Sequence, residues 1–159
     1  KDEHLKDIAD KSYQLLEYIK NKDTDSIVKM CYDGHIMYDS MNDGYISKKN
    51  LYDDFHNKGN VYSLFFDSER YYKANQNYID HHSSDYARSD YKLCLRDVLL
   101  KYEIFVDTLQ LSRIEKRATV YLNWKNKKKS QSGRIGYSIG FVNIDDKWMI
   151  GVLLDRNAL

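Results

Sequence analysis

The chain has 159 residues, which is enough for one domain with a hydrophobic core that needs no disulfide support. Its 25 basic and 24 acidic residues give a net charge of +1, so the overall charge provides no general attraction to nucleic acid or acidic lipid. Apolar runs are short, which argues against a membrane-spanning helix. We therefore predict one domain over residues 1–159, with no nucleic-acid partner and no transmembrane span.

The first 66 residues alternate helical patterns with short apolar runs. Apolar residues at three- and four-residue spacing predict an amphipathic first helix. Capping residues such as Asp23 and Ser47 mark further helix starts. In chain order we predict a helix over 3–20, a short helix from 23–26 to Gly34, a strand over 35–40, a helix from Ser47 to about Asn57, and a strand over 61–66 that pairs with the sheet.

A polar stretch at about 68–97 interrupts this pattern. Tyr, Asn, Ser and Asp dominate it, and neither a helical nor a strand period holds. We predict an insertion made mostly of loop, with some helix near 90–100. Because long loops are uncommon in compact domains, the stretch either has order that the pattern does not reveal or carries the function.

The strongest pattern lies in the last third of the chain. Apolar residues at every second position predict strands with one face against a core. The strands are expected over 102–111, 117–124, 135–141 and 148–154. Short connections favour antiparallel pairing between neighbours. The fold class is therefore α+β, with N-terminal helices packed on a curved antiparallel sheet.

This order of elements resembles the nuclear-transport-factor-2-like superfamily, also called the cystatin-like α+β cone. The resemblance rests on the paired N-terminal helices and on residues 43–47 running into the third helix. Residues 117–122 resemble the superfamily's penultimate strand, and 145–150 its final turn and strand. It implies a cone-like architecture with a hollow between helices and sheet, and it is silent on activity.

A cone of this kind implies a pocket, for which we name candidate residues. Aromatic side chains suited to an apolar ligand are Tyr38, Phe66, Tyr121 and Tyr137. Superfamily enzymes such as ketosteroid isomerases and polyketide cyclases use a pocket acid or base, but their catalytic patterns are not matched here. No catalytic residue is carried over.

Five residues remain candidates for acid–base chemistry in such a pocket: His35, Asp39, Asp67, Asp97 and Tyr102. Asp67 follows two phenylalanines and is the first to test. The alternative is that these aspartates cap turns, which is common for Asp.

The sequence predicts no metal site and no cofactor. Residues 39–50 resemble a calcium loop, but Met41 and Asn50 stand where oxygen ligands are needed, so a hairpin turn is favoured. The adjacent His81 and His82 are interpreted as part of a solvated polar loop. The basic segment 125–134 offers a phosphate or lipid contact, but a solvated turn that protects strand edges is favoured.

Several properties bear on partners and location. Gly136, Gly140 and Gly151 are expected opposite Tyr137, Ile139 and Val152, which indicates either sheet curvature or a homodimer through the sheet. Cys31 and Cys94 allow one disulfide or none and resemble small buried hydrophobes. The chain begins at Lys1 with a polar, tether-like segment, from which we expect an exported or envelope-anchored bacterial protein.

Three functional hypotheses follow. The first is a non-catalytic module that binds a small apolar ligand or a protein partner. The second is a small isomerase- or dehydratase-like enzyme that uses a pocket carboxylate. The third is an envelope-associated structural protein whose sheet packs on a partner. The first is preferred, because the residues assemble no catalytic set.

Overall fold

The computed structural model describes residues 2–39, 43–86, 92–112, 114, 116–125 and 132–155. Its helices are α1 (Asp2–Lys20), α2 (Thr24–Met30), α3 (Lys48–His56), α4 (Asn60–Phe66), α5 (Ser68–Ala74), α6 (Gln76–Tyr86) and α7 (Leu95–Lys101). Its strands are β1 (His35–Asp39), β2 (Gly44–Ser47), β3 (Glu103–Leu111), β4 (Arg117–Lys125), β5 (Ser132–Ile144) and β6 (Lys147–Asp155). The fold is α+β, as predicted.

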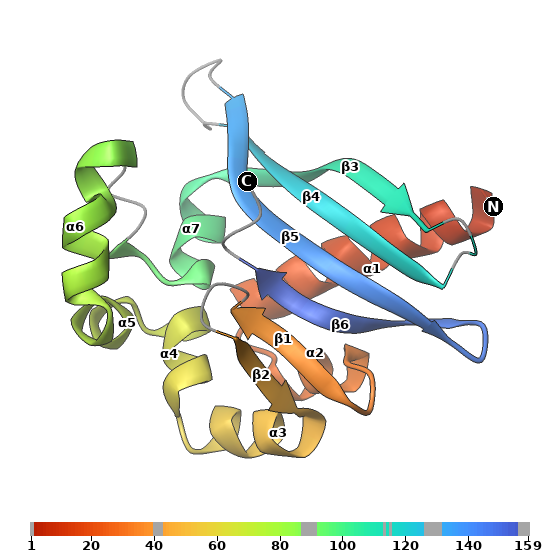
Figure 1. Ribbon diagram of the computed structural model, residues 1–159, viewed down its shortest axis with the longest axis horizontal. Coiled ribbons are helices and arrows are strands. Elements are labelled where there is room, and N and C mark those ends of the chain that lie inside the picture. The colour runs from red at the N-terminus through yellow and green to blue at the C-terminus, as the bar shows by residue number, and fades with distance from the viewer. Residues whose placement is uncertain are drawn as a thin grey trace.

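The strands form one open sheet in the order β2-β1-β6-β5-β4-β3 (Figure 1). The last four strands pair antiparallel with their chain neighbours, as their short connections predict. β1 is the exception, because it lies beside β6 in parallel through the pair Met37–Val152. The N-terminal strands therefore extend the C-terminal meander at its β6 edge.

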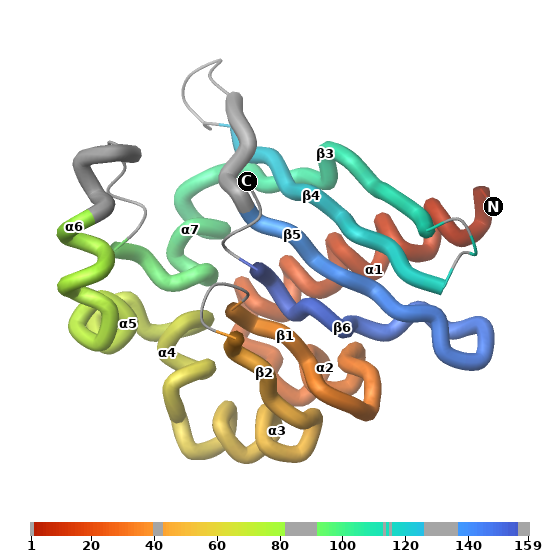
Figure 2. Tube along the Cα trace, in the orientation of Figure 1, coloured from red at the N-terminus to blue at the C-terminus, as the bar shows by residue number. Residues whose placement is uncertain are grey.

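The core lies between α1 and one face of the sheet. The apolar stripe of α1 is buried through Ile8, Leu15 and Ile19. It packs over inward-facing strand residues such as Leu122 and Ile139, which are also fully buried. Figures 1 and 2 show α1 crossing behind the sheet, while no described helix lies over the opposite face. As far as the described residues go, the sheet therefore has one covered face and one open face.

The predicted strand over 61–66 is wrong, because this segment is the helix α4. The carboxylate of Asp54 accepts hydrogen bonds from the backbone N–H groups of Val61 (3.3 Å) and Tyr62 (2.7 Å), which satisfies the free donors of the helix start. Val61 and Phe65 then share one buried face at helical spacing. A short apolar run fits a buried strand or a buried helix equally well, and the distant cap decides between them.

The polar stretch after α4 is also more ordered than predicted. It forms α5 and α6 in place of a loop, and only α7 matches the helix expected near its end. α5 buries no residue, and Ile79 is the buried residue among the described side chains of α6. Both helices stand at one end of the molecule, away from the sheet (Figure 1). Without an apolar stripe, these helices leave no hydrophobic period in the sequence.

The pairing of β5 with β6 departs from simple alternation. Register shifts occur on both sides of Gly140, and Leu153 and Leu154 are both buried although they are adjacent. Gly140 pairs with Val152, whose Cγ2 lies 2.6 Å from the position a Cβ of residue 140 would take. The two therefore share a face, which corrects the expectation that they lie on opposite faces. The close approach expected of a strand glycine is present.

Candidate functional site

Asp67, the first acid–base candidate, caps a helix. Its carboxylate accepts a hydrogen bond from the backbone N–H of Arg70 at 3.1 Å, which makes Asp67 the N-cap of α5. This is the alternative role expected of such aspartates. The bond engages one oxygen in holding the helix start.

Asp97, the second candidate, ties two helices together. The Ser68 hydroxyl donates a hydrogen bond to Asp97 Oδ2 and accepts one from the backbone N–H of Cys94 at 2.8 Å. Ser68 opens α5, whereas Cys94 and Asp97 stand at the start of α7. Burial raises the pKa of the Cys94 thiol, which therefore stays protonated and is a poor nucleophile. The arrangement joins helix ends and contains no activated group.

Tyr102, the third candidate, packs against another aromatic side chain. It follows α7, and its ring centroid lies 4.8 Å from that of Trp124 on β4. The Lys101 ammonium stands 5.3 Å from the same ring. The contact with Trp124 packs the junction between α7 and β3 against β4.

The four predicted ligand-binding aromatics do not share one hollow. Phe66 and Tyr137 are core residues, 6% and 5% exposed. Tyr38 lies against Gly44 beside the core. Tyr121 stands between the buried Val120 and Leu122, so strand alternation puts it on the open face of the sheet.

The metal-site predictions fall partly outside the described residues. In the calcium-loop candidate, residues 40–42 lie outside them, although β1 and β2 do pair as the expected hairpin. The same holds for residues 126–131 of the basic segment 125–134, the candidate phosphate or lipid contact. His81 and His82 belong to α6 and not to a loop, which corrects that interpretation. Within the described ranges, no three His, Cys, Asp or Glu side chains are placed to hold a metal. In the same ranges no helix is long and apolar enough to cross a membrane.

The open face of the sheet carries a groove of about 310 Å³. Gly140 and Gly151 contribute to its floor, and His35 and Arg117 add positive or titratable groups to its lining. The apolar lining comes from five strands and the segment before β1: Tyr32, Met37, Tyr45, Ala118, Phe141, Val142 and Val152. Among these, Tyr45 is 50% exposed. The strand glycines were the sequence signal for this site, whereas its aromatic residues come from segments that only the fold brings together.

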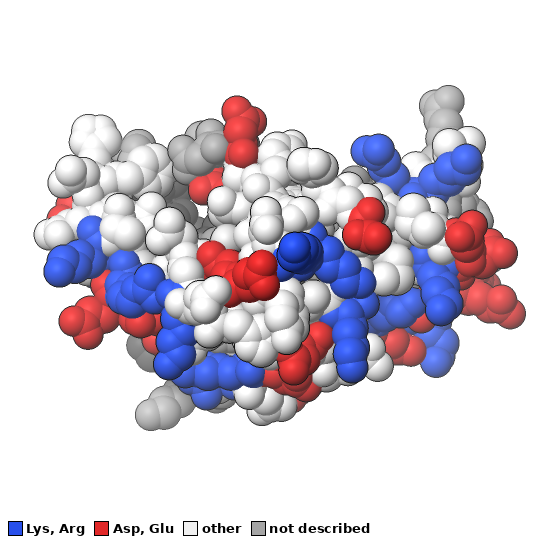
Figure 3. Space-filling view, turned by 90° about the horizontal axis from the view of Figure 1, so that it is seen from below, with Lys and Arg blue, Asp and Glu red and all other residues white. Residues whose placement is uncertain are grey.

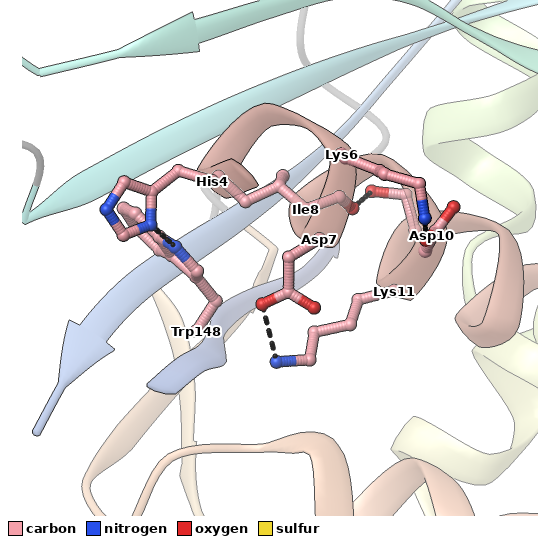
Figure 4. Close-up of polar contacts among 8 residues, drawn as sticks. His4, Lys6, Asp7, Ile8, Asp10, Lys11 and Trp148 are labelled. Atoms are coloured by element: carbon pink, nitrogen blue, oxygen red, sulfur yellow. Dashed lines mark hydrogen bonds and ion pairs between the residues drawn. The ribbon is translucent and has the colours of Figure 1, made fainter. Parts of the chain in front are cut away.

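Two further hollows lie near the start of β6, on either side of a polar contact. The Trp148 indole N–H donates to His4 Nδ1 at 2.9 Å, which joins β6 to the first turn of α1 (Figure 4). His4 lines a polar hollow of about 540 Å³ together with Lys116, Asp145 and Asp146. Trp148 lines a smaller pocket of about 230 Å³ between α1, α2 and β6. None of these three hollows is lined by Asp67, Asp97 or Tyr102.

Comparison with known proteins adds little to this picture. No protein-family model matches the chain, and no curated protein is similar to it. One similar solved structure is a crystal structure of an NTF-2-like protein of unknown function from Shewanella oneidensis MR-1. The alignment covers 95% of this chain and 96% of that chain, with 12% identity and a TM-score of 0.44. A match at this level says nothing of what either protein binds or catalyses.

Proposed function

We propose that this protein is a non-catalytic interaction module that binds a protein partner through the open face of its sheet. The partner we propose is a second copy of the same chain. The observation that carries the proposal is the groove over Gly140 and Gly151 on a sheet face that no described helix covers. Apolar and aromatic side chains gathered on an uncovered sheet face point to an interaction site.

The composition of the groove favours a protein contact. Its tyrosines, Tyr32 and Tyr45, offer large rigid surfaces that also carry a hydroxyl, and tyrosine is enriched at interfaces. Met37 adds an adaptable apolar side chain. At Gly140 the space over the strand is taken by the Val152 side chain, so Val152 forms part of the apolar surface of the groove.

The area of the face suits a pair of identical subunits. Six strands lie about 4.8 Å apart and rise about 3.3 Å per residue; four of them have nine or more residues and two have four or five, so together they offer a face of roughly 800 Å². A standard interface buries about 800 Å² per partner. A two-fold arrangement places the same face on both subunits, so one face of this size is enough.

The polar candidates support the non-catalytic part of the proposal. Asp67 caps α5 and Asp97 accepts the Ser68 hydroxyl, so both carboxylates serve the scaffold. A general acid or base needs a reachable substrate site. No specific observation in the described structure favours the isomerase-like alternative over the interaction module.

The test compares two substitutions of similarly exposed tyrosines, Tyr45→Glu on the open face and Tyr52→Glu on α3. These residues are 50% and 46% exposed. Sedimentation equilibrium of the wild-type chain should show a monomer–dimer equilibrium. Tyr45→Glu should weaken dimerisation about thirtyfold, because it removes an interface tyrosine and leaves an unpaired carboxylate in the contact, at a cost of about 2 kcal/mol.

Tyr52→Glu introduces the same charge away from the groove and should leave the equilibrium unchanged. A wild-type chain that stays monomeric at every concentration would contradict the proposed partner. Equal weakening by both variants would contradict the proposed face. Circular dichroism and thermal unfolding of both variants confirm that any loss of dimer is not a loss of fold.

A further inference from the structure

The pocket between α1, α2 and β6 combines an apolar interior with a cationic rim. Three lysines are among its lining residues: Lys11, Lys29 and Lys147. Apolar and aromatic side chains also line it: Tyr18, Met30, Trp148 and Met149. Among the described residues that line the pocket, none is acidic. The pocket shares no lining residue with the sheet groove, so binding here does not depend on the proposed dimer.

Helical spacing explains why these side chains converge. Lys11, Gln14 and Tyr18 recur at three- and four-residue steps and therefore share one face of α1. Ser26 and Met30 share one face of α2 in the same way. The two helices contact each other, and the start of β6 closes the space between them.

Trp148 gives the pocket a fixed wall. Its side chain is 2% exposed, and its indole N–H is held by His4 at 2.9 Å. The ring is therefore positioned before any ligand arrives. A preorganised aromatic wall lowers the cost of ordering side chains on binding. Met30 and Met149 supply polarisable thioethers that adapt to an apolar or aromatic guest.

The three lysines differ in their contacts with carboxylates of the protein. Lys11 forms an ion pair with Asp7 at 3.1 Å, which Figure 4 shows on the side of α1 nearest Trp148. Lys29 and Lys147 are exposed, and Lys29 acts on the distant carboxylate of Asp23 only through its charge. Both ammonium groups can turn toward an anion at the pocket mouth.

The positive charge at the pocket is local and does not reflect a general surface excess. The whole chain carries a net charge of only +1. Figure 3 shows Lys and Arg interspersed with Asp and Glu on the face seen from below. Exposed charges lose influence beyond about 10 Å at ordinary salt. An anion is therefore attracted here by the rim lysines themselves.

We propose that this pocket binds a small organic carboxylate with an apolar or aromatic body. The body lies against Trp148 and the two methionines, and the carboxylate meets Lys29 and Lys147 at the rim. The volume of about 230 Å³ is smaller than the 300–1,000 Å³ typical of drug-sized ligands, so the guest is small. An inorganic anion would leave the apolar wall unused.

The test is an NMR titration of the labelled full chain with phenylacetate, and with octanoate as an aliphatic carboxylate. Either ligand should produce saturable shifts at the Trp148 indole N–H and at the methyl groups of Met30 and Met149. Phenylacetamide has the same shape without the charge and should bind about tenfold more weakly. Absence of saturable shifts with both carboxylates would overturn the proposal. Equal binding of the amide, or the same shifts with inorganic phosphate alone, would also overturn it.

Two double variants that each remove two positive charges distinguish binding by the pocket lysines from attraction by the overall charge of the protein. Lys29→Gln combined with Lys147→Gln should weaken phenylacetate binding about tenfold. The control combines Lys6→Gln with Lys49→Gln, which removes two positive charges outside the pocket lining. An equal loss in the control would refute a specific carboxylate site. Because Tyr45→Glu lies on the other side of the sheet, it should leave phenylacetate binding intact whether or not the dimer forms.

Discussion

Cys31 and Cys94 show how far a residue's environment can be inferred from its neighbours. Both were expected to be small buried hydrophobes, and both are fully buried and free. Cys31 donates its S–H to the carbonyl of Ile27 at 3.4 Å. Burial raises the pKa of the Cys31 thiol from 9.0 to about 12. Apolar flanking residues predict burial well, because a core residue is surrounded by others of its kind.

The raised pKa of Cys31 predicts a loss of stability at alkaline pH. Below pH 9 the folded and unfolded chains both hold the proton. Between pH 9 and about 12 the unfolded chain binds fewer protons than the folded one, so the free energy of unfolding falls as pH rises. The Cys31→Ala variant lacks this contribution, and its curve should be flatter by at most about 1.4 kcal/mol per pH unit.

Urea unfolding at a series of pH values measures this difference. Val28→Ala is the matched control, since it shortens a buried side chain of α2, the helix that Cys31 caps, without removing a thiol. Its pH dependence should follow that of the wild type. Parallel curves for wild type and Cys31→Ala would contradict the shift.

The polar candidates have roles that their sequence neighbours do not indicate. The sequence names Asp67 and Asp97 as candidate pocket carboxylates, yet both stabilise helix ends. A carboxylate that caps a helix and one that serves as a base have the same local sequence. What separates them is the hydrogen-bond partner, and Ser68 meets Asp97 from 29 positions away. A one-dimensional pattern does not contain that contact.

At the scale of elements, α4 shows a cap overriding a local pattern. Asp54, at the end of α3, accepts hydrogen bonds from two backbone N–H groups at the start of α4. Asp54→Ala leaves these donors without their partner and should lower the free energy of unfolding by about 1–2 kcal/mol. Chemical denaturation measures the loss.

The neighbouring Asp53 provides the control for this prediction. Its side chain is exposed on the same helix, so Asp53→Ala should change stability by less than about 0.5 kcal/mol. If the two variants lost the same stability, the cap would have no special role. The residue that caps α4 lies outside the segment 61–66. The apolar run taken by itself therefore predicts a strand.

At the scale of the whole molecule, burial is uneven. The strands β4, β5 and β6 supply fully buried core residues such as Val120, Ile139 and Ile150. α5 buries none, and α6 contacts the rest of the described chain mainly through α5. Local opening costs least where few apolar contacts are lost. The helical extension at 68–81 should therefore open independently of the sheet.

Hydrogen–deuterium exchange tests this expectation. Amides of α5 and the first turns of α6 should exchange much faster than those in the centres of β4 and β5. Exchange that is as slow in α5 as in the sheet would show that these helices belong to the same cooperative unit.

The sequence alone determined the α+β class, the amphipathic α1 and the four C-terminal strands, because a period of 3.6 or 2 is set by which side chains face the core. The tertiary structure decided the rest. It decided that α4 is a helix, that β1 lies parallel to β6, and that Tyr32 and Tyr45 line the same groove as two strand glycines. These features depend on contacts between distant segments, and such contacts leave no periodic trace in a single chain.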